Sequence, residues 1–237
     1  METFYYFQSK HHAIILSEET LNLTPYTFGR ANKTMHESDS IYQFYKDIST
    51  DKSLTIVDIG AQSGLYTLYA KFLPLSTFYA FEPFEPTYTL LLDNLKLNNI
   101  TNVNPHLLGI SNEVGKTILN TCTSHNGLHT LGSTPLRFND IKAVEVNTDT
   151  LDNIFYNKDI PVDYIKIDTE GWEYYILMGA MKTIEKYKPY LQIEWNVVNM
   201  MQCNVEPLNL AKLITDLGYV QIKVIGEELF LRHHTRV

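Results

Sequence analysis

A short apolar stretch that ends in a glycine-containing turn constrains the fold of this chain more than any other feature. Residues 54–67 begin with β-branched side chains around Asp58, and Gly60 and Gly64 follow. This pattern predicts a buried strand, a tight loop and the start of a helix. The two glycines let the backbone turn sharply and lie close to a ligand, which the amide groups of the loop are expected to face. In open α/β sheets, a loop beyond the carboxyl end of a strand is where an adenosine-containing cofactor binds.

The spacing of this loop selects among the cofactors. It reads Asp-x-Gly-x-x-x-Gly, whereas a dinucleotide-binding loop reads Gly-x-Gly-x-x-Gly and cradles phosphates. A fixed negative charge on Asp58 at the mouth of the loop would oppose a pyrophosphate, but it suits the ammonium and sulfonium groups of S-adenosylmethionine. The loop therefore favours S-adenosyl-L-methionine as the cofactor.

A second apolar strand, over residues 77–83, ends in an acidic residue. Glu82 lies about twenty residues after the glycine loop, the offset expected of a carboxylate that binds both ribose hydroxyls. The alternative is that Asp58 caps its loop and Glu82 caps the next helix. We expect the cofactor site to draw on the loop, on this strand end and on the end of a third strand over 103–110, with these residues: Asp58, Gly60, Ala61, Gln62, Gly64, Tyr66, Thr67, Glu82, Pro83, Gly109 and Ser111.

A third informative stretch carries Asp168, Glu170 and Glu173 at the end of an apolar strand. Repulsion among carboxylates this close must be offset by a cation or a proton. Glu194, near the end of the next strand, is expected beside Asp168. We interpret Asp168, Glu170 and Glu194 either as the general base or as ligands of a divalent cation, for which oxygen donors favour Mg²⁺ or Mn²⁺. The alternatives are helix capping by Asp168 or Glu170 and pairing with Lys166.

Residues 112–145 interrupt the strand–helix rhythm and predict an inserted loop or hairpin. Its centre is rich in small and hydrogen-bonding residues, the composition of a flexible substrate lid. His125 and His129 lie there, and either can serve as a base in place of the carboxylates. The alternative for both histidines is an ordinary polar surface loop.

Apolar residues at helical spacing predict the helices that accompany these strands. A hairpin that turns at Gly226 ends the chain. Six strand–helix alternations followed by a hairpin predict an α/β fold, with a mostly parallel sheet, one antiparallel strand and helices on both faces. The helical stripes are Ile41, Phe44, Tyr45 and Ile48; Tyr88, Leu91, Leu92 and Leu95; Tyr174, Leu177, Met181 and Ile184; and Leu210, Leu213, Ile214 and Leu217.

Composition bounds the domain organisation and the partners. The 237 residues, 44% of them hydrophobic, suffice for one sizeable core, which we divide into an N-terminal extension with a helical cap (1–52) and a cofactor-binding domain (53–237). We expect no signal peptide and no membrane span, and Cys122 and Cys203 lack metal-ligand spacing, so we expect a cytoplasmic protein. A net charge of −8 disfavours large nucleic acids, and a neutral small-molecule or glycan acceptor fits better.

Together these motifs resemble the FkbM-type S-adenosylmethionine-dependent methyltransferases. The resemblance implies a Rossmann-like class I fold with a seven-stranded sheet, and usually O-methylation of a sugar or a polyketide hydroxyl. Gln62 stands where the family more commonly has Asn, and Trp172 occupies a position that is usually smaller or His. The matching segments run from about Ser53 to Tyr219 and are residues 57–67, 80–83, Asn94 with Asn98, 162–173 and 218–219.

Methyl transfer to a hydroxyl group is therefore the function that we expect, with a sugar in a glycan or glycosylated metabolite as the preferred acceptor. Trp172 and Trp195 flank the carboxylates, where aromatic faces would stack on sugar rings, although both also suit a hydrophobic core. The alternatives are an oxidoreductase on a related Rossmann-like sheet and a methyltransferase of a non-sugar small molecule. An oxidoreductase would need the phosphate-binding glycines that this loop lacks.

Overall fold

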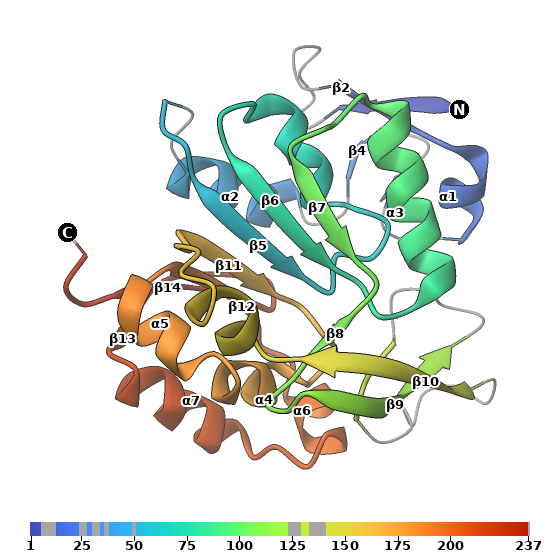
Figure 1. The fold of residues 1–237 in the computed structure, drawn as a ribbon. Coiled ribbons are helices and arrows are strands. Elements are labelled where there is room, and N and C mark those ends of the chain that lie inside the picture. Colours follow the sequence, from blue (N-terminus) through green and yellow to red (C-terminus); the bar gives the residue numbers. More distant parts are fainter. Residues whose placement is uncertain are drawn as a thin grey trace.

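The computed structural model describes residues 1–5, 13–23, 28–29, 34–35, 38–48, 51–122, 129–132 and 141–236. Its central sheet contains β5 (Thr55–Ile59), β6 (Thr77–Phe81), β7 (Val103–His106), β11 (Tyr164–Ile167), β12 (Tyr190–Glu194), β13 (Tyr219–Ile225) and β14 (Glu228–His233). These strands lie in the order β13-β14-β12-β11-β5-β6-β7 (Figure 1). Neighbours pair in parallel except at β14, which is antiparallel to both β12 and β13. The predicted seven-stranded sheet with one antiparallel strand is confirmed.

Helices cover both faces of this sheet because successive side chains of each strand point to opposite sides. The helices are α2 (Ser38–Asp47), α3 (Glu85–Leu97), α4 (Glu173–Met178), α5 (Met181–Tyr187), α6 (Val197–Gln202) and α7 (Pro207–Asp216). Ile56 and Phe78 pack in one core with α2 and α3, whereas Val57 and Ile165 pack in a second core with α4, α5 and α7. No helix in the described part of the chain is long and apolar enough to cross a membrane.

The predicted helical stripes are wrong at two positions. Leu92 of α3 and Met181 are both 38% exposed. The first lies at the outer flank of a single continuous helix, but Met181 follows a break at Gly179 that resets the helical phase. A Cβ atom on Gly179 would lie 2.1 Å from the carbonyl oxygen of Ser111, so the chain turns there to let another backbone segment approach.

The N-terminal residues share a core with the sheet. They form β1 (Glu2–Tyr5), β2 (Ala13–Leu16), α1 (Glu18–Leu23), β3 (Phe28–Gly29), β4 (Thr34–Met35) and then α2. β1 and β2 pair as an antiparallel hairpin. Their buried residues Phe4, Ile14 and Leu16 join Phe44 of α2 in the core that contains Ile56. The predicted N-terminal helix is thus present, and the hairpin before it completes one of the two cores.

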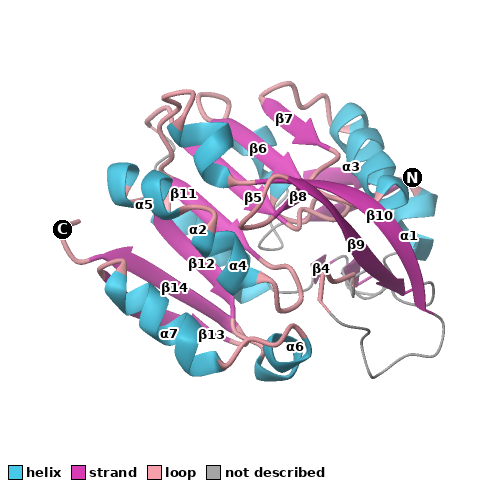
Figure 2. Cartoon of the chain, turned by 60° about the horizontal axis from the view of Figure 1, so that its bottom comes forward, coloured by secondary structure: helices cyan, strands magenta, loops and turns pink. Residues whose placement is uncertain are grey.

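A small second sheet lies at the carboxyl ends of the parallel strands (Figure 1). It contains β8 (Gly109–Ile110), β9 (Gly115–Cys122) and β10 (Ile141–Asp149) in the order β8-β10-β9, and Figure 2 shows β9 and β10 as a long ribbon. The prediction of one strand over 103–110 is wrong, because the chain leaves β7 after His106 and pairs with β10 from Gly109. The predicted insertion is this ribbon, and His125 lies outside the described residues.

Candidate functional site

The glycine loop after β5 is held by close packing against two other elements. Gly60 and Gly64 have φ values of +77° and +106°, which side chains rarely tolerate. A Cβ atom on Gly60 would lie 1.9 Å from the carbonyl oxygen of Asp168, at the end of β11. One on Gly64 would lie 2.9 Å from Leu91 of α3. Both glycines are therefore needed to bring the loop between β11 and α3.

Three amide donors of the loop, which the sequence predicts to face a ligand, are taken up by hydrogen bonds within the protein. The N–H groups of Gly60 and Ala61 both donate to the carbonyl oxygen of Phe81, at 3.0 Å. Gln62, in the left-handed region at φ +51°, donates its N–H to Glu82 Oε2 at 3.0 Å. The expectation that these amides face a ligand is wrong for these three residues, because the end of β6 takes them up.

Glu82 is buried at the end of β6 and fixes the backbone around it. Its Oε1 accepts the N–H of Phe84 at 2.9 Å, while Oε2 accepts that of Gln62. Burial raises the pKa of Glu82 from 4.5 to about 7, against the lowering effect of these two N–H groups. Each carboxylate oxygen has a second lone pair, so both can still accept a ribose hydroxyl. The half-buried Pro83 links Glu82 to the residue that precedes α3.

Asp58 lies within β5 and is buried with one oxygen unused. Its Oδ2 accepts the hydroxyl of Thr67 at 2.6 Å, and its Oδ1 has no hydrogen-bond partner among the described residues. Burial raises the pKa of Asp58, and the nearby Lys166 opposes this rise. The capping alternative therefore describes Oδ2, whereas Oδ1 is available to a cationic ligand. A buried carboxylate oxygen without a donor is costly, which favours such a ligand.

A buried polar row links this carboxylate to the next two strands. Asp58, Lys166 and Gln192 are register partners on β5, β11 and β12 and so project from the same face of the sheet. The ammonium of Lys166 lies 4.5 Å from the ring centroid of Tyr66, whose hydroxyl accepts from Gln192 Nε2 at 2.9 Å. Tyr164 donates its hydroxyl to Gln192 Oε1 at 3.0 Å. Tyr66 and Thr67, predicted at the cofactor, thus support the polar row and Asp58.

Sequence reasoning missed Gln192 and Tyr164 as members of this row. A polar residue in the middle of the apolar strand 190–194 was the available signal. Gln192 is fully buried, and buried amides need partners. Its partners, however, come from residues far away in the sequence.

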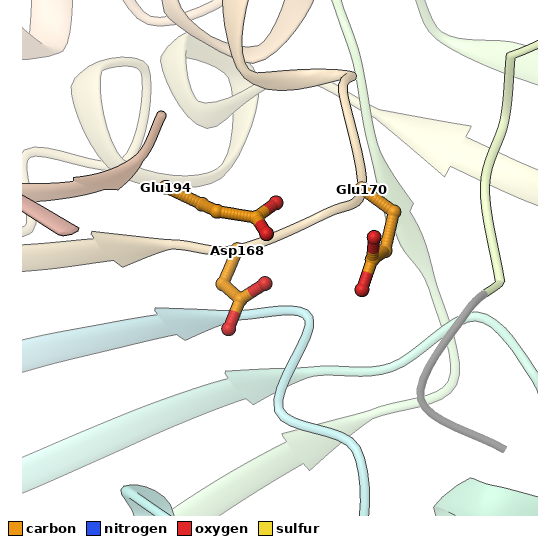
Figure 3. A group of neighbouring side chains, drawn as sticks. All are labelled: Asp168, Glu170 and Glu194. Atoms are coloured by element: carbon orange, nitrogen blue, oxygen red, sulfur yellow. The ribbon is translucent and has the colours of Figure 1, made fainter. Parts of the chain in front are cut away.

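Three carboxylates converge at the carboxyl ends of β11 and β12 (Figure 3). Asp168, Glu170 and Glu194 each offer an oxygen that lies within 4.8 Å of the other two. Asp168 follows β11 directly and Glu194 ends β12, the neighbouring parallel strand. Glu170 has φ +56° and precedes Gly171 at φ +102°, a left-handed turn that accompanies the approach of its carboxylate to the other two. We name these three residues the acidic cluster.

The acidic cluster holds more negative charge than its surroundings neutralise. Lys166 Nζ lies 2.8 Å from Asp168 Oδ2, so the predicted ion pair is present. Asn199 Nδ2 donates to Glu170 Oε2, whereas Glu194 Oε2 is buried without a partner in the part of the chain that the structure describes. Burial and then the charge of Asp168 raise the pKa of both Glu170 and Glu194 well above the ordinary range. A divalent cation or a proton from a substrate would relieve this imbalance.

Glu173 holds the turn beside the acidic cluster instead of joining it. Its Oε1 accepts the N–H and the hydroxyl of Thr169, at 2.9 and 3.0 Å, and the N–H of Gly171 at 3.2 Å. Burial raises the pKa of Glu173 to about 7. We considered Asp168 and Glu170 as caps of the following helix. The residue that binds the backbone before α4 is instead Glu173.

His129 accepts a hydrogen bond at one ring nitrogen, so its other ring nitrogen can only donate. Its Nδ1 accepts the N–H of Cys122 at 3.3 Å, which leaves the proton of the neutral ring on Nε2. That Nε2 is buried and has no partner within the described ranges, and burial lowers the pKa of His129 to about 4. The ring packs edge-on against Phe84, with centroids 4.6 Å apart. This geometry favours the carboxylates over His129 as the base.

The segment after β7 contacts the end of β6 through Leu108, a residue that we did not predict. The N–H of Leu108 donates to the carbonyl oxygen of Glu82 at 3.2 Å. Gly109 belongs to β8, and Ser111 Oγ accepts the indole N–H of Trp172 at 3.1 Å. The Trp172 ring also lies 4.2 Å from that of Tyr175. Both Trp172 and Trp195 pack against the core, in line with the alternative considered for them.

Comparison with known proteins identifies the family. The chain is an α/β protein with a glycine loop after β5 and carboxylates at its strand ends, and residues 58–220 match the methyltransferase FkbM domain family. The chain therefore belongs to this family, and the resemblance inferred from its motifs is confirmed. It is 30% identical over 143 residues to "Methyltransferase 1" of Beauveria bassiana (strain ARSEF 2860), an alignment that covers 52% of this chain and 57% of that protein. The chain thus matches little more than half the length of this relative.

Solved structures of methyltransferases resemble the fold. One is a methyltransferase FkbM from Methylobacillus flagellatus KT, with a TM-score of 0.48, 18% identity, and coverage of 76% of this chain and 43% of that one. Another is a precorrin-6y C5,15-methyltransferase from Geobacter metallireducens GS-15, with a TM-score of 0.46, 10% identity, and 92% of both chains covered.

Proposed function

We propose that this protein transfers a methyl group from S-adenosyl-L-methionine to a hydroxyl group, with a sugar as the preferred acceptor. The observation that carries the proposal is the row of carboxylates on four neighbouring strands of the parallel sheet: Glu82, Asp58, Asp168 and Glu194 on or directly after β6, β5, β11 and β12. Membership of the FkbM methyltransferase family supports the same reaction.

The residues of the cofactor side fit S-adenosylmethionine. Its ribose hydroxyls and its ammonium group are donors, and the site supplies acceptors in Glu82 and in the unpartnered Oδ1 of Asp58. The cofactor supplies a methyl group on a sulfonium centre, which the negative charge of these carboxylates would favour. A pyrophosphate would instead meet carboxylates and occupied amides, which argues against the oxidoreductase alternative.

Asp168 and its neighbours would prepare the acceptor hydroxyl. An alcohol is a poor nucleophile at neutral pH, so a group near the oxygen must remove its proton or stabilise the alkoxide. Lys166 holds Asp168 by one oxygen, and Glu194 has a buried oxygen without a partner. Asp168 can take up the hydroxyl proton directly. The acidic cluster also offers the oxygen ligands that suit Mg²⁺ or Mn²⁺, which would acidify that hydroxyl.

A second class of acceptor is favoured by a different surface. Val197, Val198 and Met201 of α6 are each nearly half exposed. Asn199 of the same helix donates to Glu170, so the helix that carries this apolar surface lies beside the acidic cluster. A hydroxyl on a non-sugar molecule with an apolar part would fit it. Cys203 forms no disulfide, and its thiol lies 3.5 Å from the hydroxyl of Thr130, which suits a reducing compartment such as the cytoplasm.

Calorimetry with S-adenosylhomocysteine and with NAD tests the class of reaction. Binding of S-adenosylhomocysteine alone is expected, and binding of NAD alone would overturn the proposal. Mass spectrometry after incubation with S-adenosylmethionine then compares glycosides with apolar alcohols. A gain of one methyl group on a sugar identifies the preferred acceptor, whereas a gain on the apolar alcohols alone would identify the second class.

Replacing Glu82 with alanine should weaken S-adenosylhomocysteine binding by about 1.5–3 kcal/mol, the range for hydrogen bonds to a charged group. Because the pKa of Glu82 is about 7, wild-type affinity should also rise between pH 6 and pH 8 as the carboxyl ionises. Calorimetry at the two pH values measures both effects. The exposed Glu185→Ala is the control. A folded Glu82→Ala protein with wild-type affinity would remove Glu82 from the ribose site.

A further inference from the structure

Asn94 of α3 connects the N-terminal segment to the cofactor loop. Its side chain is fully buried and donates Nδ2 to the carbonyl oxygen of Ser63 at 2.9 Å. Its Oδ1 accepts the hydroxyl of Thr20, in α1, at 3.2 Å. Thr20 is also fully buried. One carboxamide therefore joins α1 to the loop that follows β5.

The N-terminal segment is itself fastened to α3 and to the helix that follows the loop. Asn98 acts like a strand partner, because its Oδ1 accepts the N–H of Ile15 at 2.8 Å and its Nδ2 donates to the carbonyl of Ile15 at 2.7 Å. Lys71, in the 3₁₀-helix Thr67–Phe72, donates to the carbonyl of Ala13 at 2.8 Å. The Ser17 hydroxyl accepts the N–H of Thr20 at 3.0 Å and so caps α1. Thr20 is thus held in place from both directions.

The loop needs such support from outside. Gln62 adopts a left-handed conformation next to Ser63, and Gly64 is also at positive φ. Within the loop, the N–H of Gly64 donates to Ala61. The Ser63 hydroxyl is buried without a partner, so among the contacts described here the Asn94 amide is what fixes this residue from another element. A shift of Ser63 would carry Gln62 away from Glu82.

We propose that Asn94 is a positioning residue through which the docking of residues 13–20 sets the conformation of the cofactor loop. The family match begins at residue 58, so the Thr20 half of this connection lies outside the matched domain. The inference rests on the proposed function only in that the loop binds S-adenosylmethionine. Its consequence is that a hydroxyl in α1 tunes cofactor affinity without touching the cofactor.

Thr20→Val tests this connection, since it removes the hydroxyl and nearly keeps the shape. We expect the Kd for S-adenosylhomocysteine and the KM for S-adenosylmethionine to rise about five- to tenfold, on the order of the loss of the neutral hydrogen bond to Asn94, with kcat changed less than about twofold. The substitution also removes the contact between the Thr20 and Ser17 hydroxyls within the N-terminal segment. In the ligand-free protein, amide hydrogen exchange of the peptide 54–73 should become faster. Thr20→Ser keeps the hydroxyl and should restore both readouts.

Thr183→Val is the matched control. Thr183 is also fully buried and donates its hydroxyl to Asp152 at 2.8 Å, but it lies on α5 in the other core. It should lower stability without changing exchange in 54–73. Equal effects of Thr20→Val and Thr183→Val, or equal losses in Thr20→Val and Thr20→Ser, would overturn the inference.

The exchange readout separates this inference from the proposed function. If the wild type fails to bind S-adenosylhomocysteine, the proposed function fails, while faster exchange in Thr20→Val still supports the connection. If the wild type binds and Thr20→Val neither binds more weakly nor exchanges faster, the connection fails and the proposed function stands.

Discussion

Replacing Asp168 with asparagine is expected to lower kcat by about 10²- to 10⁴-fold, the usual contribution of a general base, while S-adenosylhomocysteine binding is kept. Asparagine has the same shape but cannot take up a proton, and it is a weaker ligand for a cation. It also removes the charge that pairs with Lys166. Steady-state kinetics with saturating cofactor measures the loss, and a melting curve verifies the fold.

Asp159→Asn is the control for this substitution. Asp159 is an exposed residue that also pairs with a lysine, Lys186, but it is not a member of the acidic cluster. Near-normal turnover in Asp168→Asn would make the acidic cluster structural.

Treatment with EDTA decides between the two uses of Asp168. Lost turnover that Mg²⁺ or Mn²⁺ restores would support the cation, and full turnover in EDTA would support direct proton uptake. If activity persists in EDTA and disappears in His129→Ala, the base is the histidine and our preference for the carboxylates is wrong.

Replacing Glu194 with glutamine should stabilise the cation-free protein at pH 8 and leave its stability nearly unchanged at pH 4. The raised pKa of Glu194 means that the folded state binds a proton that the unfolded state releases. The stabilisation from this proton is complete below the ordinary pKa of 4.5 and is lost as pH rises through the folded-state pKa. Glutamine is neutral throughout, so the two proteins diverge as pH increases.

We expect a gain of about 1–3 kcal/mol at pH 8, since an unpaired buried charge is removed. Thermal melts across this pH range measure it. Comparing the wild type with Glu194→Gln cancels the contribution of the histidines to the pH dependence of stability. Their lowered pKa values make stability rise with pH, the opposite of the effect of Glu194. Mn²⁺ at about a hundred times its Kd should stabilise the wild type by about 2.7 kcal/mol at pH 8 and the variant by less. Equal shifts in both proteins would exclude Glu194 as a ligand.

The position of the acidic cluster was predictable because parallel strands end at the same edge of a sheet. Asp168 and Glu194 each stand at the end of an apolar run, and the strand order makes those runs neighbours. Glu82 and Asp58 follow from the same rule. Periodicity and turn residues were therefore enough to locate the sheet and the edge at which these carboxylates gather.

The hydrogen-bond partners were not predictable, because they depend on contacts between distant segments. The glycines predict a turn, but they do not predict that the amides of Gly60 and Ala61 donate to the carbonyl oxygen of Phe81. Likewise, which oxygen of Asp58 is left for a ligand depends on the position of the Thr67 hydroxyl, which bonds Oδ2. For His129, the protonated nitrogen follows from the backbone of Cys122, which the sequence does not place. Local patterns thus located the site and left its donors and acceptors undetermined.

The left-handed turn at Glu170 has a consequence for how this protein would respond to selection. Holding a residue with a Cβ atom in that conformation costs about 1–2 kcal/mol, and glycine or asparagine would relax the backbone. A laboratory screen for heat resistance alone would therefore enrich glycine or asparagine at position 170 and discard the third carboxylate of the acidic cluster. Selection for heat resistance would then favour glycine or asparagine at position 170, whereas selection for turnover would favour glutamate.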